Sequence, residues 1–476
     1  MSTRPQGEDW DQLLALAGRW VRDYRSRIGA LPVLARVEPG WLLRQLPKAP
    51  PEKGESPERW FEDLERLIEP ALTHWNHPGF LGYFGITGSP PGVVAEFVAA
   101  ALNVNGMLWK TCPALTELEQ VVTGWYGQSL GLPEAWFGMI TDTASTSNLL
   151  ALGAARERAL PEVREKGLRA RPQLRLYCSQ EAHSSVDKAA MVLGIGRENV
   201  VRVGTDEAFR MRVELLEEAV VKDLQAGYKP FAVVATVGTT SSTSVDPVRE
   251  IAQVCEKYGL WLHVDAAYAG SAAVAPEFRW ALDGCELADS FVANPHKWLF
   301  TPIDCSCLFT AHPEAFQQAY ALHPAYLTTD TSGVPDLMDY GFQLGRRFRA
   351  LKLWFVFRAF GTQGLAEQIR RHVDLARQFG KWVAASHDFE LLAPILFSVV
   401  NFRWHPVGVD SEDLLEAANR KLLEMVNGKG RVFLSHTVLA GRSALHLAVG
   451  NLYTDQQTLS AAWEDLQQLK EFLSHT

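Results

Sequence analysis

The stretch FAVVATVGTTSSTSVDPVREIAQVCEKYGLWLHVDAAY, residues 231–268, decides the fold. It opens on one apolar, β-branched run and closes on a second, and both runs predict buried strands. Between them, residues 247–259 place apolar side chains at helical spacing. Strand, helix and strand in this order predict two parallel strands joined by a crossover helix. Other strand candidates of the same kind are residues 174–179, 199–204 and 289–295.

These segments predict an α/β fold with a mostly parallel central sheet that helices cover on both faces. In such sheets a ligand binds beyond the carboxyl ends of the strands. Residues 265–268 and 294–297 follow two of the predicted strands. We therefore expect them to lie together at the ligand-binding edge.

The chain changes character on either side of the sheet. The first 85 residues contain apolar residues at helical spacing in 9–28 and 56–75, which predict helices and a dimer arm. After residue 370, strand patterns alternate with helix patterns, which predicts a smaller α+β domain. The predicted strands there are 397–404 and 443–450, and the predicted helices are 411–426 and 456–473. We predict three parts: a helical arm (1–85), a large domain (86–370) and a small domain (371–476).

Composition excludes several kinds of partner. The 476 residues carry 46 basic and 55 acidic side chains, a net charge of −9, and no basic block, so we expect no nucleic acid partner. No apolar run approaches membrane-spanning length, and the polar N-terminus predicts no signal peptide. Six cysteines show neither zinc spacing nor a disulfide framework. We expect a cytoplasmic protein without a metal site, since His296, Asp304 and Cys305 lack recognisable ligand spacing.

The stretch NPHKWLF, residues 294–300, surrounds one lysine with apolar groups. A lysine there either extends its ammonium group to water or is pushed toward the neutral, nucleophilic amine. On its own the stretch favours the first interpretation, because buried lysine is rare. Lys297 becomes informative only together with other residues.

Two stretches could hold a charged, flat ligand. TDTASTSNLLALGAARERAL, residues 141–160, runs from a hydroxyl-rich turn into a helix, so the N–H groups of Ala144 and Ser145 suit a phosphate. The alternative is an ordinary Ser/Thr helix cap. HVDAAYAG, residues 263–270, ends a strand on Asp265, which needs a positive or hydrogen-bonding partner. The small Ala267 leaves room for a flat group, and the alternative is a structural salt bridge.

A third stretch, EAHSSVDKAA (181–190), places His183 between a strand and a helix. Histidine can stack on a ring while it donates a hydrogen bond, although a lone histidine is more often structural. Together the four stretches meet the needs of pyridoxal 5'-phosphate. Lys297 would form the Schiff base, Asp265 would keep the pyridine nitrogen protonated, and the helix start would hold the phosphate.

The chain also resembles a known family. HVDAAYAGSA (263–272), DSFVANPHKW (289–298) and LGRRFRALKLWFVFR (344–358) are similar to the pyridoxal-phosphate-dependent group II decarboxylases, especially the aromatic L-amino acid decarboxylases. The resemblance implies the type I, aspartate aminotransferase-like fold and an intertwined homodimer with active sites at the subunit interface. It implies decarboxylation of tryptophan, tyrosine, phenylalanine or dihydroxyphenylalanine to the amine and carbon dioxide.

The resemblance also implies roles for single residues. The cofactor contacts fall on Ala144, Ser145, His183, Thr236, Asp265, Ala267, Asn294, His296 and Lys297. Lys297, Asp265, His183 and Tyr326 would be catalytic. Tyr326, in HPAYLTTDTSG (323–333), matches a tyrosine on a mobile loop that protonates Cα. Gly345 would reach the site of the neighbouring subunit.

The substrate-binding residues are expected in HWNHPGFLGYFGI and NVNGMLWK. Trp75, Phe84, Ile86 and Met107 are apolar and suit an aromatic side chain, with Gly85 between them. No arginine cluster is present to meet a second carboxylate. Gly85, Met107 and Asn105 depart from the family's usual proline, aromatic and aliphatic residues, so the preferred aromatic acid stays open.

Two rival functions were weighed. An aldehyde synthase on the same scaffold would pass the carbanion to oxygen, but such relatives typically replace the loop tyrosine or the stacking histidine, and Tyr326 and His183 are both present. A catalytically silent, cofactor-binding interaction protein would not need Lys297, Asp265, His183 and Tyr326 together. We therefore expect a decarboxylase.

Overall fold

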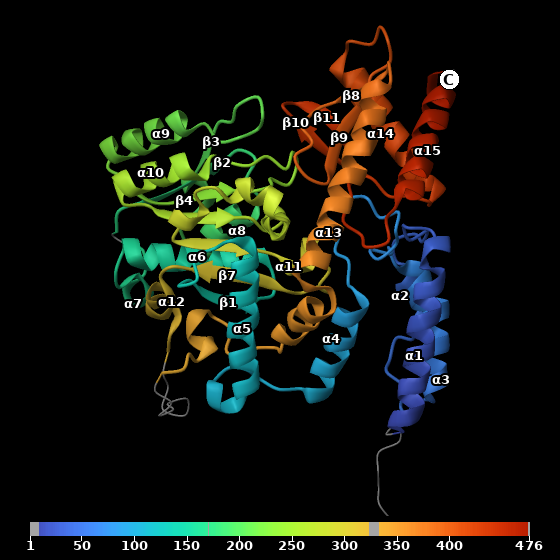
Figure 1. Cartoon of the computed structure of the whole chain (residues 1–476), viewed down its shortest axis with the longest axis horizontal. Coiled ribbons are helices and arrows are strands. Elements are labelled where there is room, and N and C mark those ends of the chain that lie inside the picture. The colour runs from blue at the N-terminus through green and yellow to red at the C-terminus, as the bar shows by residue number, and fades with distance from the viewer. Residues whose placement is uncertain (1–8, 170, 323–332, 475–476) are drawn as a thin grey trace, which may run out of the picture.

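The computed structural model describes residues 9–169, 171–322 and 333–474. Its centre is a seven-stranded sheet with strand order β1-β7-β6-β5-β4-β2-β3 (Figure 1). The strands are β1 (Phe137–Thr141), β2 (Leu174–Ser179), β3 (Val200–Val203), β4 (Lys229–Thr236), β5 (Trp261–Asp265), β6 (Ser290–Ala293) and β7 (Ser306–Thr310). β7 is antiparallel to β1 and β6, and the other neighbours pair in parallel. The mostly parallel sheet predicted from the sequence is thus confirmed.

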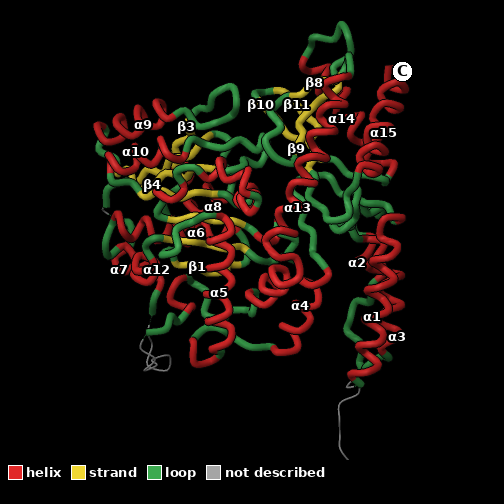
Figure 2. The backbone as a smooth tube through the Cα atoms, in the orientation of Figure 1, coloured by secondary structure: helices red, strands yellow, loops and turns green. Residues whose placement is uncertain are grey.

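Helices cover both faces of this sheet, as Figure 2 shows. One core packs α5 (Pro113–Leu130), α9 (Val213–Gln225) and α10 (Val248–Tyr258) on one face. A second core packs α6 (Ala144–Ala159), α8 (Ser185–Val192) and α12 (Pro313–Tyr320) on the other. Alternate residues of β4 divide between them: Val233 joins the first core and Val234 the second. A strand buried on both faces needs the continuous apolar run that the sequence contains.

A second sheet of four antiparallel strands has the order β10-β11-β9-β8. Its strands are β8 (Phe389–Leu391), β9 (Val399–Trp404), β10 (Ser435–Leu439) and β11 (Arg442–Ala448), and α14 (Glu412–Lys429) and α15 (Gln456–Ser474) pack against it. The long helix α13 (Ala350–Ala385), which is interrupted at Gly361 by a residue with positive φ (61°), runs from one sheet to the other. The predicted boundary at residue 371 lies inside α13, so the division into three parts stays a prediction.

The N-terminal segment contains α1 (Trp10–Arg27), α2 (Trp41–Gln45) and α3 (Pro57–Asp63), which lie away from the large sheet (Figure 1). The helix predicted for 9–28 is confirmed. The helix predicted for 56–75 ends earlier and changes type: α3 ends at Asp63, a π-helical segment (Leu64–Ile68) and a 3-10 helix (Glu69–Ala71) follow, and Pro70 cannot donate to a continuing α-helix. α4 (Pro90–Leu102) then leads into the large domain.

Between α3 and α4, residues 79–83 run alongside the four-stranded sheet. Leu81 N donates to Phe433 O (2.9 Å), Phe433 N donates to Gly79 O (2.8 Å) and Ala448 N donates to Leu81 O (2.7 Å). The segment just before Phe84 is therefore held by main-chain hydrogen bonds to β11 and to the residues before β10.

Within the described ranges, no helix combines the length and apolar composition needed to cross a membrane. All six cysteines are buried and unpaired.

Candidate active site

A cavity of about 190 Å³ opens at the carboxyl ends of the central strands. It is lined by Phe84, Thr143, Ala144, Ser145, His183, Thr236, Gly238, Thr240, Asp265, Ala267, Tyr268, Asn294, His296 and Lys297. All nine predicted cofactor-binding residues are among them, and so is Phe84 from the predicted substrate set. The fold brings them together because their loops all follow strands of one sheet, on the edge where parallel strands end.

Lys297 and Asp265 share this cavity. Asp265 is the last residue of β5, and Lys297 lies on α11 (Pro295–Trp298), directly after β6. Burial lowers the pKa of the Lys297 amine, and the neighbouring Asp265 carboxylate opposes that shift. The Lys297 Nζ atom lies 5.2 Å from the centre of the Phe84 ring. The environment favours a nucleophilic amine over a lysine that extends to water.

Asp265 is held by hydrogen bonds to its two oxygens. The backbone N–H of Ala267 donates to Oδ1 (3.1 Å), and Asn148 Nδ2 donates to Oδ2 (2.8 Å). Asp265 is only 6% exposed. A fixed carboxylate opposite a lysine can accept a proton-bearing ring nitrogen between them.

The start of α6 and the segment from Asn294 to His296 both line the cavity. Ala144 and Ser145 are the first residues of α6, where backbone N–H groups have no intrahelical acceptor. Cys305 N donates to His296 Nδ1 (2.9 Å), so the ring carries its proton on Nε2. Burial lowers the pKa of His296 to about 4. This end of the cavity presents neutral donors, which suit a phosphate.

The residues that line the cavity suit pyridoxal phosphate. The hydroxyl of Thr236 is buried and has no hydrogen-bond partner within the described chain, so it is available to a ligand. Ala144 and Ala267 keep the walls close to the backbone, where a flat ring needs space. The residues present therefore fit the group.

His183 lies at the exposed mouth of the cavity. Its Nδ1 accepts the backbone N–H of Ser185 (3.1 Å) and lies 2.9 Å from the Ser185 hydroxyl. Partial burial lowers the pKa of His183, with Asp265 opposing. The ring is positioned to lie over a ligand and to donate from Nε2.

Five predicted substrate residues lie outside the cavity: Trp75, Gly85, Ile86, Met107 and Gly345. Trp75 packs on Phe80, with ring centres 4.3 Å apart. Gly85 adjoins Phe84 in sequence and faces Gly450. Tyr326 and its loop lie outside the described residues.

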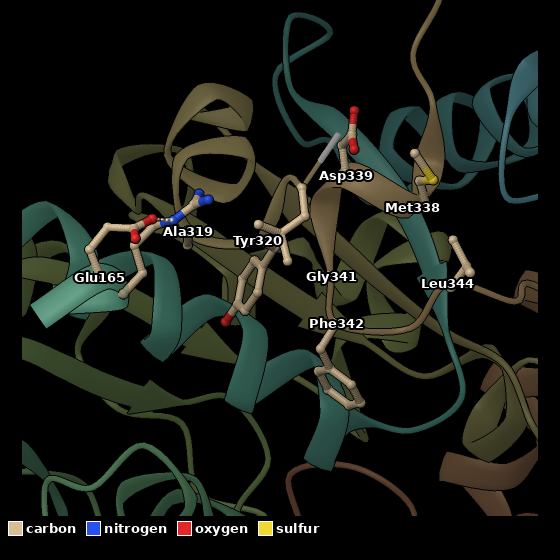
Figure 3. Close-up of a pocket in the computed structure, with 10 residues that line it drawn as sticks. Glu165, Ala319, Tyr320, Met338, Asp339, Gly341, Phe342 and Leu344 are labelled. Atoms are coloured by element: carbon tan, nitrogen blue, oxygen red, sulfur yellow. Dashed lines mark ion pairs between the residues drawn. The ribbon is translucent and has the colours of Figure 1, made fainter. Parts of the chain in front are cut away.

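Met107 and Gly345 lie near a different hollow of about 560 Å³. Figure 3 shows residues of its lining, among them Tyr320, Met338, Phe342 and Leu344. Met338 N donates to Met107 O (3.1 Å). None of the predicted cofactor-binding residues lines this hollow, so we assign the chemistry to the smaller cavity.

The sequence reasoning missed three kinds of residue in the site. Tyr268 stacks on Phe84, with ring centres 3.8 Å apart and planes 12° apart, and Trp298 stacks on the other face of Tyr268 at 4.9 Å. Tyr268 directly follows Asp265-Ala266-Ala267, so its position in the sequence could have indicated that it lies in the site. Gly238 and Thr240, after β4, also line the cavity. Asn148 is fully buried behind it, and an asparagine inside a helix carries no such signal.

A mostly parallel sheet that brings a lysine and a carboxylate into one cavity at its carboxyl edge defines a pyridoxal-phosphate-dependent enzyme of the aspartate aminotransferase-like fold. The model of the pyridoxal-dependent decarboxylase conserved domain matches residues 39–405. The chain belongs to this family.

Individual relatives cover nearly the whole chain. Tyrosine decarboxylase 4 of Petroselinum crispum is 43% identical over 94% of this chain and 90% of its own. Phenylacetaldehyde synthase of Arabidopsis thaliana is 39% identical over 96% of this chain and 94% of its own. The crystal structure of Oryza sativa TDC with PLP and tryptamine matches with a TM-score of 0.96 and 35% identity, covering 99% of each chain. Among the described residues, no cluster of three potential metal ligands occurs.

Proposed function

We propose that this protein removes the carboxylate of an aromatic L-amino acid, with pyridoxal 5'-phosphate held in the Lys297 cavity, and releases the amine and carbon dioxide. The observation that carries the proposal is the shared cavity of Lys297 and Asp265, with an amine of lowered pKa beside the Phe84 ring. The relatives support it, since they are named for tyrosine decarboxylation or were solved with tryptamine.

Each polar group that lines the cavity would have its own role toward the cofactor. Lys297 would hold the cofactor covalently through its side-chain amine. Asp265 keeps the ring nitrogen protonated, and Ala144, Ser145 and His296 hold the phosphate with N–H groups. When bound, pyridoxal phosphate supplies an acceptor for the electron pair that the Cα–carboxylate bond leaves behind.

His183 and Tyr326 handle the substrate. His183, with its proton on Nε2, would donate to the substrate carboxylate and orient it. Tyr326 gives Cα its proton after carbon dioxide has left. Replacing Tyr326 with phenylalanine should stop amine formation or divert it to aldehyde while cofactor binding remains. Unchanged amine output would remove Tyr326 from the reaction.

Aromatic specificity follows from the wall opposite the polar groups. Phe84 and Tyr268 present stacked rings, and no arginine lines the cavity among the described residues. A second carboxylate on the substrate would therefore be buried without a counter-ion, which is costly. An aromatic side chain instead gains contact with the rings.

We further propose a cytoplasmic homodimer with active sites at the subunit interface. Val93, Val94 and Phe97 are exposed on α4, and an exposed apolar helix face is typical of an interface. Met107 and Gly345 lie outside their own chain's cavity, as residues that serve a neighbouring site would. Sedimentation of the purified protein gives the oligomeric state, and cell fractionation gives the location.

One experiment separates the candidate functions. Purified protein with cofactor is offered tryptophan, tyrosine, phenylalanine, dihydroxyphenylalanine and glutamate, and carbon dioxide, amine, aldehyde and peroxide are measured. We expect carbon dioxide and amine in equal amounts from at least one aromatic acid and none from glutamate. Aldehyde with peroxide would establish the aldehyde synthase, and no carbon dioxide from any acid would establish a silent cofactor-binding protein.

A further inference from the structure

A buried hydrogen-bonded chain joins the two residues that face the cofactor, and Asn148 of α6 is its branch point. Asn148 Nδ2 donates to Asp265 Oδ2 (2.8 Å) and to the Ser185 hydroxyl (2.9 Å). Asn148 Oδ1 lies 2.9 Å from His263 Nε2. Asn148 and His263 are both fully buried, and Ser185 is 2% exposed. All hydrogen-bonding atoms of the Asn148 side chain are therefore occupied inside the protein.

The donor and acceptor in each of these hydrogen bonds can be assigned, because some groups in the chain can only donate and others can only accept. An ionised Asp265 can only accept, so the Asn148 atom beside it is the amide nitrogen. Asn148 Oδ1 must then accept from His263, which places the His263 proton on Nε2. Burial lowers the pKa of His263 to about 4, which keeps the ring neutral.

The hydrogen bonds at the far end of the chain are consistent with this direction. A neutral His263 with its proton on Nε2 accepts at Nδ1, where the Ser290 hydroxyl lies at 2.8 Å. The Ser290 oxygen in turn accepts from Trp261 Nε1 (2.8 Å), and an indole nitrogen can only donate. Trp261, which can only donate, and Asp265, which can only accept, are thus both compatible with a His263 proton on Nε2.

The second branch reaches His183. Ser185 accepts from Asn148 with its oxygen, so its hydroxyl proton points to His183 Nδ1. The backbone N–H of Ser185 donates to the same nitrogen. His183 therefore carries its proton on Nε2, away from Ser185 and available to a ligand in the cavity.

We propose that Asn148 is a positioning residue whose one amide aims Asp265 at the cofactor's ring nitrogen and orients the Ser185 hydroxyl, which supports the hydrogen bond that the Ser185 backbone N–H gives to His183 Nδ1. Asn148 itself lines no part of the cavity and acts only through these two groups. The inference deepens the proposed function and rests on Asp265 and His183 facing the cofactor.

The first test compares two leucine variants of buried asparagines in the same domain. Asn148→Leu keeps the number and branching of the side-chain heavy atoms and removes all three hydrogen bonds. Asn199→Leu is the matched control, because Asn199 is 5% exposed and bonds to Ile195 O and Arg175 at the far edge of the sheet. A hydrogen bond to a buried charge corresponds to about a ten- to hundredfold effect on an equilibrium.

Cofactor affinity and the visible absorbance of the bound cofactor are measured without substrate, followed by kcat and KM. For Asn148→Leu we expect about ten- to hundredfold weaker cofactor binding, a shifted absorbance titration, and a kcat loss of similar size with little change in KM. Asn199→Leu should match the wild-type protein in all three. An Asn148→Leu protein that matches wild type in affinity and absorbance would overturn the proposal.

Asn148→Asp gives a second, nearly isosteric test that does not depend on the leucine variant folding. It still accepts from His263 but places a carboxylate against Asp265, so the pair binds cofactor well only when it shares a proton. The titratable groups around it are Asp265 and His263 on β5, His183 before α8, Lys297 on α11 and, acting on His183, Lys188. We expect its cofactor affinity to rise at least about tenfold from pH 8 to pH 6, relative to wild type.

A pH-independent difference between Asn148→Asp and wild type would contradict the proposal. Because affinity and absorbance need no substrate, they report on Asn148 whatever the enzyme acts on. A wild-type protein that decarboxylates no aromatic acid, while Asn148→Asp still shows the pH signature, would reject the proposed function and retain the positioning role.

Discussion

The cavity around Lys297 has two walls of different origin. The polar wall comes from residues 143–306 of the large domain, where Asp265, Asn294 and His296 are held by hydrogen bonds. The aromatic wall is a stack of Phe84, Tyr268 and Trp298. The topology of one sheet brings the polar wall together, whereas the aromatic wall also depends on the small domain.

Two contacts show this dependence. The Tyr268 hydroxyl lies 2.6 Å from the Ser398 hydroxyl, and His446 Nε2 donates to Tyr83 O (3.1 Å) beside Phe84. Ser398 precedes β9 and His446 lies on β11. Cofactor binding and substrate choice should thus respond to different substitutions.

The largest effect is expected from the polar wall. Lys297→Ala should abolish the visible absorbance of the bound cofactor and lower decarboxylation by at least about a thousandfold, because the covalent anchor is lost. Lys257→Ala, on the exposed face of α10, is the control and should retain both. A Lys297→Ala protein with the wild-type spectrum would remove Lys297 from the site.

Acid should weaken both walls together. Burial lowers the pKa of His263, His296 and His446 to about 4 and that of His372 to about 3. In the unfolded chain a histidine titrates near 6.5, so the unfolded state binds more protons between about pH 6.5 and 4. The neutral buried rings therefore contribute their full share to the stability of the folded protein above pH 6.5, and this contribution is lost as the pH falls.

We expect the free energy of unfolding to drop by about 2 kcal/mol per buried histidine between pH 6.5 and pH 5. Urea unfolding at a series of pH values measures this. His372→Asn should reduce the loss of unfolding free energy between pH 6.5 and pH 5 by the contribution of one histidine. His387→Asn, at an exposed position, should leave that loss unchanged. A flat profile for the wild-type protein would contradict the prediction.

A smaller effect should separate the aromatic wall from the polar one. Phe84→Leu keeps an apolar side chain but loses the stack on Tyr268, so KM for the aromatic substrate should rise up to about tenfold. Cofactor absorbance and affinity should stay unchanged. Phe316→Leu, in the buried face of α12, controls for general loosening of the core. If Phe84→Leu weakened the cofactor as strongly as the substrate, the two walls would not be separate.

The smallest effect tests how the aromatic wall is held. A Cβ on Gly85 would lie 3.3 Å from the backbone C and Cα atoms of Gly450, so Gly85→Ala should cost about 1 kcal/mol of unfolding free energy and change KM slightly. Gly18→Ala, inside α1 with open space around it, should instead stabilise by about 0.5–1 kcal/mol. Thermal unfolding of both variants measures the difference, and equal signs would contradict it.

The polar wall was largely predictable from the sequence for a physical reason. Continuous apolar runs identified β2, β4 and β5, and parallel strands must end at one edge, so Asp265 and Lys297 could be placed together before any coordinates. β1 and β7 were missed: they pair with each other in antiparallel orientation, and β7 follows β6 without the crossover helix that marks the parallel strands.

The other features of the site depend on contacts between distant residues, which no local sequence pattern indicates. Asn148 lies 117 positions before Asp265, and its polar side chain resembles that of any exposed helix residue. The setting of Phe84 depends on Phe433 and Ala448, more than 340 residues away. Trp75, Met107 and Gly345 stay predictions, since their tasks need loops or a subunit beyond those described.

The main-chain bonds between residues 79–83 and the small domain also set an order for assembly during translation. The ribosome delivers Leu81 hundreds of residues before the amide of Ala448 that binds it. A growing polypeptide can thus finish the polar half of the cavity once β7 has been released, while Phe84 waits for β11. Catalytic competence would switch on only after β11 has been synthesised and has paired with the segment before Phe84.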